Sequence, residues 1–375
     1  MKFTIKREIL LNTLSNVSRG LTSKTPTPSL TGIYVEVSED KIDFITTNRE
    51  LSIKVELIPN DEILVEESGS CLIPGKYFVE IIKKVEDEYI TVSLFDSTAI
   101  KIITERSQFT LNALEKSVFP KLNFEGLGEP IVFEAQEIKK IIRQTAFSAA
   151  TSEQRIVLTG VNFELNGQSL FITSTDSFRL SRKNTLLSKG YDKKKINIPS
   201  KSIEELNKIL DDNSDVVELF LVNNKALFKC KNICFITRLI EGTYPDVSSL
   251  FPKNYLVEIK FYKNELISAI DRAALFNTND ALNLVKIQIL PNNKVKLLST
   301  STEIGNIEED VYPLFVSENL QLQVAFNPKY LVDALKAFDS NEVVVKFTGE
   351  IKPFIVTSEN DKELTQLILP ARIFN

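Results

Sequence analysis

Three lysines occupy the same place in a repeated strand-to-helix sequence, and their side chains are suited to holding phosphate groups. Lys76, Lys201 and Lys329 recur at nearly equal intervals along the chain, and each follows a proline by one or two positions. A lysine ammonium is a flexible point charge, whereas arginine is a fixed bidentate donor. The three positions therefore predict weak contacts to a polyanion, although each lysine could instead cap or solvate the start of a helix.

A second landmark keeps the same period. Thr47-Asn48, Thr175-Asp176 and Thr300-Ser301 recur at matching intervals, and each closes a strand-like run upstream of its lysine. Two landmarks in register predict a triplication. The chain has 375 residues, more than one hydrophobic core usually organises. Because Pro- and Gly-bearing stretches mark the boundaries, the expected domains are 1–127, 128–252 and 253–375.

Each repeat combines amphipathic helices with alternating strands. Ile138, Ile141 and Ile142 recur at helical spacing, and similar patterns open the other two repeats. Runs such as 32–37 and 285–289 alternate apolar with polar residues, as half-buried strands do. A second helix is expected after each proline junction, where a missing N–H costs nothing. The predicted fold class is α+β with mostly antiparallel sheets.

Composition excludes most enzymatic sites. The chain has no histidine and neither GxGxxG nor GxxxxGK[ST], so histidine-based nucleophile pairs, histidine metal sites and phosphate loops are absent from the sequence. Cys230 and Cys234 flank a predicted hairpin turn, and Cys71 lies far away, so zinc would need two more soft ligands. We expect reduced structural thiols, no cofactor and no metal. A histidine-free carboxylate hydrolase stays open, but it would leave the repeat unexplained.

The charges are unevenly distributed. The chain has a net charge of −5, whereas the six predicted helices sum to +6 and leave −11 for the rest. The helices comprise residues 6–20, 74–86, 136–150, 201–210, 263–276 and 328–338. Basic residues on helices can also be solvent-exposed side chains that only increase solubility. If the helices face one centre, however, that centre is positive and would hold a polyanion threaded through it.

No 18-residue apolar run and no signal peptide are visible, because the N-terminus enters a strand and a helix at once. We expect a soluble, cytoplasmic protein without membrane association.

Over its full length the chain resembles the bacterial DNA sliding clamps, the β subunits of DNA polymerase III. Five strings match family landmarks in order: 1–5 (MKFTI), 174–180 (STDSFRL), 241–246 (EGTYPD), 326–330 (FNPKY) and 369–373 (LPARI). The resemblance implies a DNA-clamp fold and a head-to-tail homodimer. It also implies a ring with helices inside around duplex DNA and antiparallel sheets outside. The function would be processivity in DNA replication, without catalysis.

The resemblance also implies three kinds of site. Lys24 and Arg155 would contact DNA without sequence specificity, beside the three repeated lysines. Phe109 and Leu111 of one subunit would face Leu275 and Phe276 of the other. A pocket for short linear motifs would be formed by Leu158, Thr175, Ser177, Phe178, Arg179, Leu180, Pro245, Leu250, Asn327, Tyr330, Leu369, Pro370, Ala371 and Arg372.

The partners implied for that pocket are the DNA polymerase III catalytic subunit, the clamp loader complex, and other polymerases and repair proteins. The chain departs from the common family pattern at Ser177, Phe178 and Ala371, where glycine, histidine and a longer apolar residue are frequent, and in its terminal Phe374-Asn375. The peptide preference therefore stays open. A sequence-reading DNA regulator is the other alternative, but no single recognition helix is apparent.

Overall fold

The computed structural model describes residues 1–22, 25–211, 216–276, 284–301 and 304–371. The predicted sites Lys24 and Arg372 lie outside these residues. The described chain divides into two compact units, one of residues 1–138 with 205–239 and the other of residues 139–204 with 240–375. Its α-helices are α1 (Arg7–Val17), α2 (Gly75–Lys84), α3 (Ala135–Thr145), α4 (Ser200–Ile209), α5 (Lys263–Ala274) and α6 (Pro328–Lys336).

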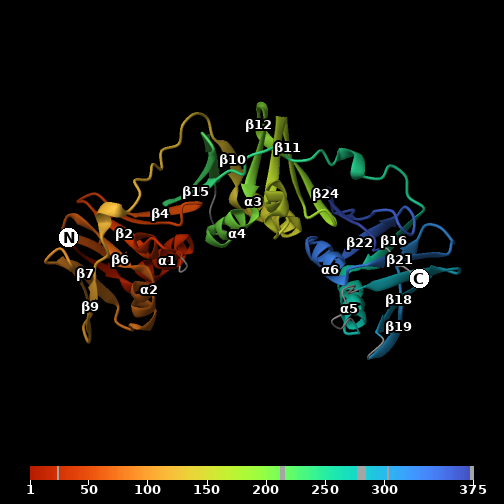
Figure 1. Cartoon of the computed structure of the whole chain (residues 1–375), viewed down its shortest axis with the longest axis horizontal. Coiled ribbons are helices and arrows are strands. Elements are labelled where there is room, and N and C mark those ends of the chain that lie inside the picture. Colours follow the sequence, from red (N-terminus) through yellow and green to blue (C-terminus); the bar gives the residue numbers. More distant parts are fainter. Residues whose placement is uncertain (23–24, 212–215, 277–283, 302–303, 372–375) are drawn as a thin grey trace. The chain divides into compact units, whose positions relative to one another are not determined.

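The first unit contains two antiparallel sheets (Figure 1). The five-stranded sheet has the order β5 (Ile63–Glu67), β1 (Lys2–Lys6), β7 (Tyr89–Phe95), β8 (Ala99–Ile103) and β9 (Gln108–Asn112). The eight-stranded sheet has the order β10 (Ile131–Glu134), β13 (Val216–Val222), β14 (Lys225–Cys230), β15 (Ile233–Arg238), β4 (Leu51–Leu57), β3 (Ile42–Thr47), β2 (Gly32–Val37) and β6 (Gly69–Pro74). Helices α1 and α2 lie side by side in this unit.

The second unit is also built on two antiparallel sheets. The seven-stranded sheet has the order β11 (Gly160–Thr175), β12 (Arg179–Pro199), β24 (Asp361–Ile368), β23 (Phe354–Ser358), β22 (Glu342–Phe347), β16 (Val257–Tyr262) and β20 (Phe315–Val316). The four-stranded sheet has the order β19 (Gly305–Val311), β18 (Lys294–Ser301), β17 (Val285–Leu290) and β21 (Leu322–Phe326). Helices α5 and α6 lie side by side (Figure 1). The α+β prediction with antiparallel sheets is confirmed.

Each proline junction leads from a strand into a helix, as predicted. At α6 the side chain of Asn327 accepts the N–H of Lys329 at 3.0 Å, and Pro328 is the first helical residue. The expected helix 74–86 begins one residue too early, whereas Pro199 lies before the expected helix 201–210, as predicted. Pro74 precedes α2 as its N-cap residue and Pro199 ends β12.

Hydrogen bonds repeat with the predicted period. The hydroxyl of Thr46 donates to the carbonyl of Val17 at 2.5 Å, and the hydroxyl of Ser174 donates to the carbonyl of Thr145. The two donors and the two acceptors are separated by the same interval in the sequence. Each bond ties the end of a helix to a buried strand. The first two repeats therefore share this side-chain interaction at corresponding positions.

Two places where strands of neighbouring repeats pair are named here as seams. The first seam is the antiparallel pairing of β4 with β15 in the first unit, with Val55 opposite Ile233. The second seam is the pairing of β12 with β24 in the second unit, with Lys183 opposite Leu364. These pairings extend sheets from one repeat into the next.

No helix in the described part of the chain has the length and apolar character required to span a bilayer.

Candidate functional site

A cavity of about 420 Å³ lies in the second unit, where β11 turns into β12. Its walls also come from the segment before β11, the segment after β15 and the end of β24. Nine residues of the predicted pocket line it: Leu158, Thr175, Ser177, Phe178, Arg179, Leu180, Pro245, Leu250 and Leu369. The structure thus brings together segments as distant in the sequence as those of Leu158 and Leu369.

The turn between β11 and β12 is held by its own side chains. The carboxylate of Asp176 accepts the N–H groups of Phe178 at 2.8 Å and Arg179 at 2.9 Å. The hydroxyl of Thr175 accepts the N–H of Ser177 at 3.1 Å. Ser177 has φ of +78°, a left-handed conformation that glycine adopts more readily. The turn is therefore fixed in one shape, at some conformational cost.

Arg179 is immobilised at the edge of this cavity. Its guanidinium pairs with Asp333 at 2.7 Å and Asp176 at 3.1 Å, and it donates to the carbonyl of Phe147 at 2.7 Å. It also lies 4.8 Å from the ring centroid of Tyr330. Since these contacts use all its nitrogens, Arg179 acts chiefly as a rigid wall.

The outer walls of the cavity are apolar and accessible. Phe178 is 60% exposed and stacks on Tyr330 with ring centroids 6.5 Å apart. Leu250 is 48% exposed and Leu369 is 37% exposed. The N–H of Leu369 donates to the carbonyl of Phe178 at 2.9 Å, which ties the C-terminal segment to the turn. Such walls suit a ligand with large apolar side chains.

The remaining predicted pocket residues have other positions. Asn327 caps α6, Tyr330 supports Phe178 and Arg179, and the N–H of Ala371 donates to the carbonyl of Ala325. None of these, nor Pro370, lines the cavity. Sequence reasoning missed the lining residues Val157, Thr243, Asp246, Val247, Pro353 and Leu367. Most of these adjoin predicted residues in the sequence, whereas Pro353 carries no signal that could have identified it.

Arg155, predicted to contact DNA, lines this same cavity and is exposed. It lies in a 3-10 segment (Glu153–Thr159) that it interrupts with φ of −128° and ψ of 82°. The structure therefore associates it with the pocket, and its role in DNA binding stays a prediction.

The three repeated lysines share one environment. Lys76, Lys201 and Lys329 are exposed in the first turns of α2, α4 and α6, and none has an ion-pair partner among the described residues. Lys83 of α2 differs, since it pairs with Glu80 at 3.4 Å, whereas Lys84 and Lys336 are exposed and likewise have no ion pair within the described ranges. Unpaired ammonium groups can bind phosphates without first breaking an ion pair.

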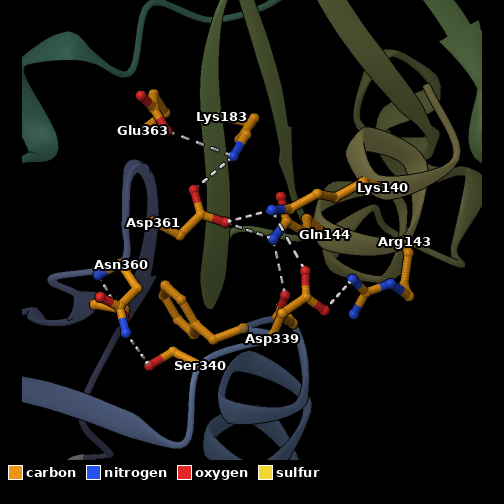
Figure 2. A network of polar contacts seen from close by, with 12 residues as sticks. Lys140, Arg143, Gln144, Lys183, Asp339, Ser340, Asn360, Asp361 and Glu363 are labelled. Atoms are coloured by element: carbon orange, nitrogen blue, oxygen red, sulfur yellow. Dashed lines mark hydrogen bonds and ion pairs between the residues drawn. The ribbon is translucent and has the colours of Figure 1, made fainter. Parts of the chain in front are cut away.

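A buried polar network joins the second seam (Figure 2). Asp361 accepts from Lys183 at 2.6 Å and Gln144 at 2.8 Å, and lies 3.5 Å from the ammonium of Lys140. Burial alone would raise the pKa of Asp361, but these hydrogen bonds and charges outweigh it and lower the pKa. Lys140 also pairs with Asp339, at 3.4 Å. The network holds α3 against the third repeat through charged groups.

The predicted interface residues lie beside unpaired strand edges. Phe109 and Leu111 are half-buried on one face of β9, which ends its sheet among the described strands. A groove of about 370 Å³ next to β9 is lined by Phe109 and by the C-terminal half of α2. Leu275, just after α5, is 72% exposed, and Phe276 is half-buried. The interface assignment stays a prediction.

Comparisons with known proteins agree along the whole chain. The DNA polymerase III β-subunit models for the N-terminal, central and C-terminal domains match residues 1–123, 133–246 and 248–372. The Beta sliding clamp of Staphylococcus epidermidis is 38% identical over 378 residues, and that of Staphylococcus aureus is 37% identical, each covering 100% of both chains.

Solved structures show the same relationship. The DNA polymerase sliding clamp of Bacillus subtilis has a TM-score of 0.94 at 35% identity, covering 100% of both chains. The DNA polymerase III β chain of Streptococcus pneumoniae has a TM-score of 0.95 at 31% identity, covering 99% of this chain and 100% of that one. The chain thus belongs to the DNA polymerase III β-subunit family and is a DNA sliding clamp.

Proposed function

We propose that two copies of this chain join head to tail into a ring around duplex DNA and hold the replicative polymerase there. The observation that carries the proposal is that two strand edges corresponding to those at the seams have no partner strand among the described strands. By the repeat period, β9 corresponds to β15 and β24, and β19 corresponds to β4 and β12. The corresponding strands pair at the first and second seams, whereas β9 and β19 each end a sheet of the described strands. Pairing them between copies would cover both edges, which otherwise invite aggregation.

Apolar side chains support the same pairing. Phe147 packs against the core of the third repeat in the second unit. Leu275 stands at the corresponding position of the next repeat, yet it is 72% exposed. The groove lined by Phe109 offers the surface that Leu275 of a second copy would need. Head-to-tail pairing of two copies buries this contact twice.

The proposed interface is tested by replacing Leu275 and Phe276 together with alanine. Losing two buried apolar side chains at each interface would cost about 2 to 5 kcal/mol per side chain, so we expect folded monomers. Analytical ultracentrifugation at micromolar concentration measures the mass, against 42.4 kDa for one chain. Alanine at Leu186, which is 72% exposed on β12 and lies outside the proposed interface and the pocket, is the control. A double variant that stays fully dimeric would refute this interface.

DNA would be held by topology, with only weak phosphate contacts from Lys76, Lys201, Lys329, Lys24 and Arg155. Contacts of that kind weaken steeply with salt, whereas a closed ring stays linked. We expect the clamp loaded on circular DNA to survive high salt and to dissociate once the circle is cut. Equal loss from circular and linear DNA in salt would contradict the ring.

The pocket beside Arg179 would take short linear motifs of the polymerase III catalytic subunit, the clamp loader complex, and other polymerases and repair proteins. Its exposed apolar walls around a fixed turn support this use. Deleting residues from Leu369 onward should abolish binding of polymerase-derived peptides and leave the dimer intact. Fluorescence anisotropy measures the affinity, and unchanged binding would place the peptide site elsewhere.

The proposed role is tethering without catalysis. It would be exercised in the cytoplasm, where bacterial DNA is replicated.

A further inference from the structure

A second cavity, of about 530 Å³, lies in the first unit beside the first seam. It is enclosed by α1, β4, the C-terminal part of α4 and the turn from β14 to β15. Ile9, Leu57 and Ile233 contribute apolar walls, whereas Asn12 and Asn16 contribute amides. None of its lining residues belongs to the peptide pocket or to the proposed DNA contacts.

The repeat explains why this space exists. At the tenth position of α3, Gln144 is fully buried and donates to the carbonyl of Ala337 at 3.0 Å and to Asp361 at 2.8 Å. The tenth position of α1 is Asn16, the corresponding residue of the first repeat, with a side chain one methylene shorter. Within the described part of the chain, the amide of Asn16 makes a single hydrogen bond, a 3.5 Å contact with Asn12, and it lines the cavity. Gln144 thus fills the space at the second seam, whereas the shorter Asn16 leaves a cavity at the first seam.

The cavity carries an excess of positive charge. Arg19, Lys208 and Lys231 line it, and two carboxylates face them: Glu205 lies 2.9 Å from Arg19 and 2.6 Å from Lys208, and Asp211 lies 3.7 Å from Lys231. Counted over the described residues alone, three cations and two anions leave one net positive charge; Asp212 and Asp215 lie outside those residues. The Nε of Arg19 is buried and has no acceptor within the described ranges. A buried donor without an acceptor is costly, and a rotation of the guanidinium toward an oxygen in the cavity would relieve that cost.

We propose that this cavity binds a carboxylate carried on an apolar or aromatic body. The carboxylate accepts from the Nε–H of Arg19 and neutralises the excess charge, while the body packs against Ile9, Leu57 and Ile233. The volume falls within the usual range for small-ligand sites. A free carboxylic acid and the C-terminal residue of a peptide share this chemistry. An occupant of either source would contact both repeats across the first seam.

The absence of tryptophan allows a site-specific reporter. Asn12 is exposed at the cavity, so Asn12→Trp places the sole tryptophan there, and its emission is followed during titration of the full-length protein. Calorimetric titration of the unsubstituted protein with the same probes shows whether the tryptophan obstructs the site. The probes are N-acetyl-phenylalanine and a short glycine-serine peptide ending in phenylalanine, each compared with its C-terminal amide. We expect saturable binding of an acid and none of its amide. The acid that binds more tightly identifies the source of the ligand.

Two further substitutions in the reporter locate the binding. Arg19→Gln should weaken binding of the acid by about tenfold or more. The control is Arg143→Gln, which makes the same change at an ion-paired arginine near the end of α3. Asn16→Phe keeps Arg19 and should block binding by filling the space. The proposal is overturned if neither acid binds, if acids and amides bind equally, or if both cavity variants bind as the control does.

Discussion

Each seam has an ion pair between an arginine and a carboxylate, and the two arginines come from different positions of the repeat. At the first seam, Arg19 comes from the end of a helix and pairs with Glu205 at 2.9 Å. At the second, Arg179 comes from the start of a strand and pairs with Asp333 at 2.7 Å. The two carboxylates occupy the same position in successive repeats. The carboxylate of the pair therefore keeps its position between the two repeats, whereas the arginine is supplied by a helix end in one and by a strand in the other.

The exchange changes what each seam can bind. Phe147 occupies the helix-end position of Arg19, and Leu51 occupies the strand position of Arg179. At the second seam, the arginine borders the apolar pocket and the half-buried phenylalanine packs against the core of the third repeat. At the first seam, Leu51 is buried and the arginine borders a polar cavity. One repeat plan therefore yields two pockets with different chemistry.

The largest expected effect comes from the buried pair at the second seam. Lys183→Met leaves the carboxylate of Asp361 buried without its nearest cation, so the free energy of unfolding should fall by about 3 to 5 kcal/mol. Lys54→Met is the matched change at the first seam. It should cost less, because Lys54 is the more distant cation of Asp43 at 3.7 Å and Lys41 remains at 3.0 Å, whereas Lys183→Met leaves Asp361 only the more distant Lys140 at 3.5 Å. Urea denaturation of both variants measures the difference.

A double variant controls that experiment. Replacing Lys183 with methionine and Asp361 with leucine removes both charges, and much of the lost stability should return. If the single and double variants are equally unstable, the loss arises from packing and the ion pair is not responsible.

The exchanged helix-end positions give the second effect. Phe147→Ala should lower the free energy of unfolding by about 2 to 3 kcal/mol, because the ring packs against the core of the third repeat. Arg19→Ala should cost less than about 1 kcal/mol, because its ion pair is partly exposed. Comparing the urea midpoints of the two variants tests the contrast, and equal losses would argue against it.

Acid should weaken the second seam before it removes all structure. The pKa of Asp361 and that of Asp339 are both lowered, because basic partners outweigh burial. The folded state therefore binds fewer protons than the unfolded state, and the free energy of unfolding falls as pH drops below about 4. As pH is lowered through that range, the urea midpoint should decline less steeply in Asp361→Asn than in the unsubstituted protein. An identical decline would exclude Asp361 as a source of the pH dependence.

The smallest effect concerns a turn that both seams share. Arg49 and Ser177 have φ of +77° and +78°, in the left-handed region that glycine tolerates best. Replacing either residue with glycine should increase the free energy of unfolding by less than about 1 kcal/mol. The change is measured as a small rise in the thermal unfolding midpoint. Ser177→Gly should also leave the peptide affinity nearly unchanged, because neighbouring side chains fix the turn. A loss of stability at both positions would show that the strain is negligible.

The sequence determined the repeat, the α+β class and the strand-to-helix junctions. Each of these depends on local rules: landmarks that recur at one interval, the spacing of apolar residues, and proline or asparagine before a helix, as at Asn327. Nine residues that line the cavity of the second unit were predicted from sequence, because they lie in or near strings that carry the family resemblance; their role in peptide binding stays a prediction.

Only the tertiary structure decided which distant side chains meet. The pairing of Lys183 with Asp361 spans 178 residues, and Pro353 joins the pocket from a segment with no pattern of its own. Arg155 faces the pocket through a break in a short helix that no periodicity reveals. Periodicity specifies which face of an element is buried, but not which element covers it. That choice depends on volume and charge at the seams, as the one-methylene difference between Asn16 and Gln144 illustrates.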